Sequence, residues 1–122
     1  MEKIRVFGLN RLDSMDLKRQ FPDADITFEA PDPNDPNRGE LVTAALIVLG
    51  FAGIQALATW LLRTSKHGKI RHKIQTINSR GERHTEEFEM DVTESTSRAD
   101  VVEALGKVMK FDPSVLKEPS SS

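Results

Sequence analysis

LVTAALIVLGFAGIQALATWLL, residues 41–62, contains no charged residue and no proline. The stretch is too long and too uniformly apolar for a single strand. It therefore predicts one helix over Leu41–Leu62, about 30 Å long at 1.5 Å per residue. That helix decides the predicted fold, because the shorter segments on both sides must bury their apolar faces against it.

Two environments suit such a helix. A length of about 30 Å matches the hydrocarbon core of a bilayer, and a basic segment from Arg63 to Lys73 follows it, as positive-inside anchoring requires. This alternative is a small, single-pass protein of the inner membrane. The other reading is a cytoplasmic protein with a buried core helix. Gln55 in the middle of the run, and the strands that a membrane span would separate, favour the core helix.

Composition limits the classes of protein. The chain has 122 residues, 38% hydrophobic and 30% charged, with a net charge of −2. This suits one α+β domain, predicted over residues 1–112, followed by a flexible tail over residues 113–122. Cysteine is absent, which excludes a disulfide framework, a thiolate zinc site and a cysteine nucleophile.

A β-hairpin is predicted after the apolar run, because Lys69–Ile77 and Arg83–Val92 both alternate between apolar and polar residues. A loop at Ser79-Arg80-Gly81 places Gly81 in the left-handed conformation. The resulting register puts His72 opposite Phe88 and Ile70 opposite Met90. On the other face Arg71 meets Glu89, Lys73 meets Glu87 and Lys69 meets Asp91. These pairs explain the basic run and favour internal ion pairing over nucleic-acid binding.

The remaining elements are shorter. Strands are predicted at Ile4–Gly8 and Ala24–Glu29. Between them lies a helix capped by Asp13 or Ser14, and a last helix runs over Ala99–Lys110. Its cap is Ser97, with Asp100 in the capping-box position. The first helix should bury Leu12, Met15 and Leu17.

The predicted fold class is α+β, in the order β-α-β, one long apolar helix, β-hairpin, C-terminal helix. A four-stranded, mainly antiparallel sheet packs on the long helix. The side chains expected to contact that helix are Ile4, Val6, Ile26, Phe28, Ile70, Ile74, Phe88 and Met90.

Catalytic and ligand-binding motifs are missing from the sequence. No nucleophile elbow, P-loop or dinucleotide fingerprint occurs, and the three histidines are too scattered to form a metal-binding pair. Asp32, Asn34 and Asp35 resemble calcium ligands, but Pro36 stands where a further ligand should be. We therefore expect a non-enzymatic protein without catalytic residues, metal or cofactor.

The layout resembles the effector-associated constant components of bacterial conflict systems. The resemblance rests on the opening Ile4-Arg5-Val6 strand, a proline-rich loop ending in Gly39-Glu40, and a long helix closing on Trp60-Leu61-Leu62-Arg63. A basic strand and the turn glycine Gly81 follow. In place of the Trp-Leu pair often found in that family's first helix, this chain has Met15-Asp16-Leu17.

The resemblance implies a non-enzymatic adaptor that relays an invasion signal in antiviral defence. Its partner would be an effector, such as a trypsin-like or caspase-like peptidase, or a nucleotide-dependent switch protein.

A contact surface is predicted at the end of the long helix. Trp60 is the only tryptophan, a residue type favoured at interfaces. With Leu61 and Arg63 it would bind an effector or a second copy of the chain. The alternative is that Trp60 completes the core.

Overall fold

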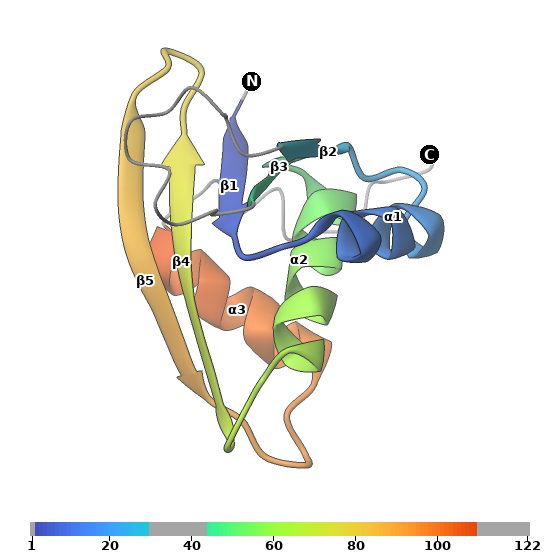
Figure 1. Ribbon diagram of the computed structural model, residues 1–122. Helices are drawn as coiled ribbons and strands as arrows, with labels where there is room; N and C mark the ends of the chain where they lie inside the picture. The colour runs from blue at the N-terminus through green and yellow to red at the C-terminus, as the bar shows by residue number, and fades with distance from the viewer. Residues whose placement is uncertain (1, 30–43, 110–122) are drawn as a thin grey trace, which may run out of the picture.

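The computed structural model describes residues 2–29 and 44–109, which form an α+β fold (Figure 1). Three helices gather on one side of a single sheet. The predicted tail and the proline-rich loop with Asp32, Asn34 and Asp35 lie outside the described residues. The elements are β1 (Lys3–Phe7), α1 (Arg11–Gln20), β2 (Ile26–Glu29), β3 (Ala44–Val48), α2 (Phe51–Arg63), β4 (Lys69–Ile77), β5 (Arg83–Asp91) and α3 (Arg98–Met109).

The sheet has five strands in the order β2-β3-β1-β4-β5, and every neighbouring pair is antiparallel. β1 lies at the centre, with Val6 between Ala45 of β3 and Ile74 of β4. Since side chains alternate along a strand, one face carries the apolar residues and packs on the helices. Of the eight side chains predicted to line this face, six are buried, Met90 packs against the core, and Phe28 is half-buried.

The prediction of one helix over Leu41–Leu62 is wrong. Leu41–Thr43 lie outside the described residues, Ala44–Val48 form strand β3, and the helix begins only at Phe51, after the N-cap Gly50. The predicted four-stranded sheet therefore gains a fifth strand. Within the described part of the chain, no helix is long and apolar enough to cross a membrane.

The position of β3 explains the uniform apolar run. β3 is an interior strand between β1 and β2, with Ala45 and Ile47 buried on the helix face. Its other face carries Ala44, Leu46 and Val48, so both faces are apolar. The chain then turns back immediately, and α2 crosses over its own preceding strand. This close approach requires a glycine at position 53, because a Cβ there would overlap the carbonyl oxygen of Val48 and lie 2.9 Å from Ile47 Cγ2.

The hairpin confirms the predicted register residue for residue. His72 lies opposite Phe88, Ile70 opposite Met90, and Gly81 has a φ of +83° in the turn. On the polar face Arg71 forms ion pairs with Glu89 at 3.0 Å and, diagonally, with Glu87. The hydrogen bond and the charge of Arg71 lower the pKa of Glu87. The basic run is thus partly neutralised within the hairpin, as predicted.

The helix starts show one confirmation and one correction. At α3 the Ser97 hydroxyl accepts from the Asp100 amide at 3.2 Å, and Asp100 accepts from the Ser97 amide at 2.9 Å, which is the predicted capping box. At α1, Asn10 is the cap, and its Oδ1 accepts from the amide of Asp13 at 2.8 Å. The helix therefore begins earlier than predicted.

Candidate functional site

The predicted contact residues separate into core and surface. Trp60 and Leu61 are 1% and 0% exposed, so both lie in the hydrophobic core, the alternative that the sequence left open for Trp60. Arg63 is exposed at the end of α2. Of the three predicted contact residues, only Arg63 is on the surface of this chain.

Trp60 is held by polar groups from two other elements. Its indole Nε1 donates to Oδ2 of Asp13 on α1 at 3.1 Å. Its ring packs against the imidazole of His72 on β4, with the ring centres 4.6 Å apart and the planes tilted by 46°. His72 Nε2 also lies 3.1 Å from the hydroxyl of Thr64. Burial lowers the pKa of His72, because desolvation disfavours the imidazolium.

A second polar contact ties α1 to α2. Oδ2 of Asp16 accepts from Arg63 Nη1 at 2.6 Å and from Gln20 Nε2 at 3.0 Å. With the Asp13 contact to Trp60, both acidic side chains of α1 are engaged with α2. The sequence suggested Asp13 as a helix cap and did not reveal the partner of either aspartate, which lies 47 residues further along the chain.

The side of α1 that faces away from α2 carries apolar and basic residues. Leu12 is 77% exposed and Met15 is 54% exposed, the exposed large hydrophobic residues of the described chain. The prediction that both are buried is wrong; Leu17 and Ser14 face the core instead. The exposed cations Arg11, Lys18 and Arg19 share this side. At 3.6 residues per turn the five residues fall within an arc of about 120°. We call this set the α1 stripe: Arg11, Leu12, Met15, Lys18 and Arg19.

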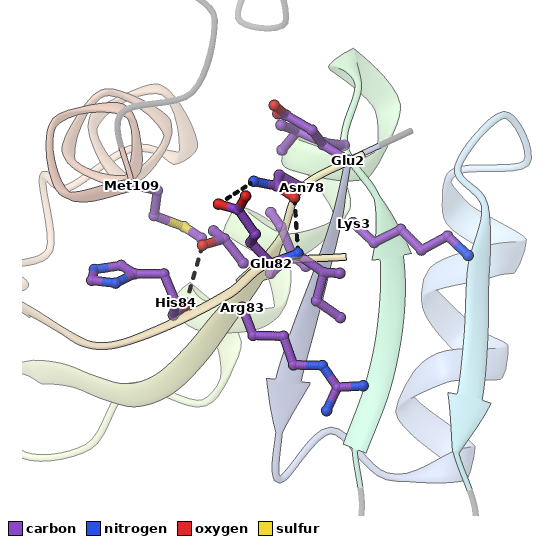
Figure 2. A pocket seen from close by; sticks show the side chains of 11 residues that line it. Glu2, Lys3, Asn78, Glu82, Arg83, His84 and Met109 are labelled. Atoms are coloured by element: carbon purple, nitrogen blue, oxygen red, sulfur yellow. Dashed lines mark hydrogen bonds between the residues drawn. The ribbon is translucent and has the colours of Figure 1, made fainter. Parts of the chain in front are cut away.

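A hollow of about 340 Å³ lies at the turn end of the hairpin, between β1, β4, β5 and the end of α3. Figure 2 shows that its ionisable side chains point in different directions: the imidazole of His84 and the guanidinium of Arg83 leave on opposite sides, and Lys3 points away from both. The hydroxyl of Thr76 donates to the carbonyl of His84 at 3.2 Å. The side chains that line the hollow therefore do not bring an acid, a base and a nucleophile together at one point.

The same hollow is framed by the hairpin loop. Asn78 Oδ1 accepts from the amide of Arg80 at 2.9 Å. It also accepts from the amide of Glu82 at 2.9 Å, and the Asn78 side-chain nitrogen donates to the Glu82 carboxylate at 3.2 Å (Figure 2). These contacts organise the turn. His84 pairs with Glu86 at 2.6 Å on the exposed surface of β5. Asn78 thus explains the loop geometry: its Oδ1 is occupied by backbone amides and its side-chain nitrogen by the Glu82 carboxylate.

A polar chain crosses the face of the sheet opposite the helices. Arg5 of β1 forms a two-pronged ion pair with Glu29 of β2, including Nη2 to Oε1 at 3.1 Å, and its Nη1 donates to Gln75 of β4 at 2.6 Å. Gln75 in turn donates to the hydroxyl of Thr85 on β5 at 3.1 Å. This polar chain of side chains links strands β2, β1, β4 and β5, with Arg5 reaching over β3, and it stabilises the sheet.

Metal binding and similarity to known proteins add no further site. In residues 2–29 and 44–109, no group of three or more histidine or carboxylate side chains could hold a metal ion. No protein-family model, curated protein or solved structure matches the chain. The resemblance to effector-associated constant components remains a prediction from the sequence.

Proposed function

We propose that this chain is a non-enzymatic, cytoplasmic adaptor that binds a partner protein through the α1 stripe. The observation that carries the proposal is the exposure of Leu12 and Met15, 77% and 54%. They stand one helical turn apart on a helix that is fixed to the domain by Asp13 and Asp16. A rigid, exposed pair of large apolar side chains is a typical anchor for a partner.

Arg63 belongs to the rim of this surface. It is bonded to Asp16, which follows Leu12 by one turn of α1. The predicted contact near the end of α2 is thereby shifted: Trp60 holds α1 from inside, Leu61 lies in the core, and Arg63 flanks the stripe. The interface we propose is therefore built on α1, with α2 as its base.

The wider role we propose is signal relay in a bacterial conflict system. Its partner would be an effector, such as a trypsin-like or caspase-like peptidase, or a nucleotide-dependent switch protein. The layout around Trp60-Leu61-Leu62-Arg63, followed by the basic strand β4, is what supports this assignment. An adaptor needs only a stable scaffold and an exposed contact surface, and α1 on its α2 base provides both.

The test uses the full chain and the purified proteins encoded beside its gene. Complex formation is measured by size-exclusion chromatography and calorimetry for the wild type, for Leu12→Ser/Met15→Ser and for Arg80→Ser, a matched surface change at the hairpin tip. We expect the double variant to lose binding by at least about tenfold while its melting temperature is unchanged, since both side chains are exposed. Equal binding by all three proteins, or no complex with any neighbour-encoded protein, would overturn the proposal.

A further inference from the structure

The charge of the α1 stripe indicates which partner it fits. Within the described residues, both acidic side chains of α1 are engaged by α2, Asp13 by Trp60 and Asp16 by Arg63. The exposed arc therefore carries Arg11, Lys18 and Arg19 around the apolar pair, and no carboxylate of α1 lies in that arc. The net −2 charge of the whole chain hides this local excess of positive charge.

We propose that the α1 stripe receives an acidic amphipathic helix of the partner protein, one whose apolar seam is flanked by glutamate or aspartate. This inference rests on the proposed function and specifies its partner. An arc of about 120° is wide enough to contact another helix, and Leu12 and Met15 are its two apolar residues. Around the helix the order within the arc is Lys18, Arg11, Met15, Arg19 and Leu12, so the cations lie beside and between the two apolar side chains and would pair with carboxylates next to the partner's seam.

Two other occupants fit less well. A second copy of the chain packed α1 against α1 would bring Arg11, Lys18 and Arg19 against the same cations, which opposes association. An anionic membrane attracts cations, but an interfacial helix must sink about 5–10 Å into the headgroup region. The contacts of Asp13 and Asp16 hold α1 against the body of the domain, and the α1 stripe has only two large apolar side chains. These features do not favour insertion of α1 into a bilayer.

The experiment uses a synthetic helix as the probe. A fluorescent peptide of about three heptads, with leucine at the seam and glutamate on both flanks, is titrated with the full chain and followed by anisotropy. The control peptide has lysine in place of glutamate. Protein variants are Lys18→Glu/Arg19→Glu, Leu12→Ser, and Arg80→Glu as a charge reversal away from α1. Vesicles of phosphatidylcholine and phosphatidylserine are tested by sedimentation.

We expect the glutamate peptide to bind at least about ten times more tightly than the lysine peptide. Lys18→Glu/Arg19→Glu should weaken the binding of the glutamate peptide at least about tenfold, and Leu12→Ser should weaken it by a similar factor. Arg80→Glu should bind the peptide as tightly as the wild type. Raising NaCl from about 50 to about 500 mM should weaken binding several-fold, because exposed charges are screened. Equal binding of the two peptides, or vesicle binding without peptide binding, would overturn the inference.

The natural partner separates this inference from the proposed function. Suppose that a neighbour-encoded protein binds the wild type, and that this binding is lost in Leu12→Ser but kept in Lys18→Glu/Arg19→Glu. The adaptor function then stands and the acidic-helix inference fails. If the glutamate peptide binds as expected while no neighbour-encoded protein does, the inference holds for the surface and the adaptor assignment fails.

Discussion

The indole of Trp60 donates a hydrogen bond to the carboxylate of Asp13 across 47 residues of sequence, at 3.1 Å. This one contact joins the core of the domain to the helix that carries its exposed apolar pair. Because Trp60 is buried on all other sides, its position sets that of α1. The stability of the core and the presentation of Leu12 and Met15 are thereby coupled.

Trp60→Ala should destabilise the protein by about 3–5 kcal/mol, since a large buried aromatic leaves a cavity. Trp60→Phe should cost less, because it keeps most of the packing and loses the bond to Asp13. Urea unfolding followed by circular dichroism measures both changes. Asp13→Asn is the matched control: it keeps an acceptor oxygen and should unfold near the wild-type midpoint. A Trp60→Ala variant as stable as wild type would contradict the core position.

Stability should fall in acid because of His72. Its pKa is lower in the folded than in the unfolded protein, so the unfolded state binds the proton more tightly and stability rises with pH. The contribution is complete above the ordinary value of about 6.5 and is lost progressively as pH falls toward the lowered folded pKa.

The measurement is the free energy of unfolding between about pH 5 and 8, compared for wild type and His72→Leu. The variant should show a flatter profile over that range. Fluorescence of the only tryptophan gives a second readout, because an imidazolium against the ring quenches it. Identical slopes for wild type and His72→Leu would refute the assignment.

Gly53→Ala should destabilise the fold by about 1–3 kcal/mol, although alanine is the better helix former. The added methyl meets the carbonyl of Val48, a backbone group of the neighbouring strand that cannot move aside. Gly50→Ala is the control, because a Cβ there meets nothing within 4 Å. Thermal melts should therefore separate the two alanine variants. Equal melting temperatures would show that α2 does not press on β3 as closely as described.

Arg5→Ala should cost about 1–3 kcal/mol, because Glu29 and Gln75 then lose a charged donor in a partly buried setting. Arg5→Lys should recover only part of this, since an ammonium cannot reproduce the two-pronged contact with Glu29. Arg83→Ala serves as a control on an exposed residue of the same face. The free energy of unfolding is measured by chemical denaturation. Equal destabilisation by Arg5→Ala and Arg83→Ala would contradict the stabilising role of the polar chain.

Local patterns determined much of the fold. The register of β4 and β5 follows from alternation and from the turn at Gly81, which act over neighbouring residues and so could be predicted. The Ser97–Asp100 capping box is equally local. The faces of the strands were predicted too, because a half-buried strand places its apolar residues at every second position.

Only the tertiary structure decided the rest. Ala44–Val48 is a strand because β1 and β2 pair with it on both sides; the positions on its outer face, Ala44, Leu46 and Val48, are apolar too, which removes the alternation that identifies strands. Leu12 and Met15 are exposed because Asp13 and Asp16 turn toward Trp60 and Arg63, distant residues that no helical period reveals. The sequence alone determined which segments could pair and cap locally. Packing between distant segments determined which apolar residues were buried and which remained available to a partner.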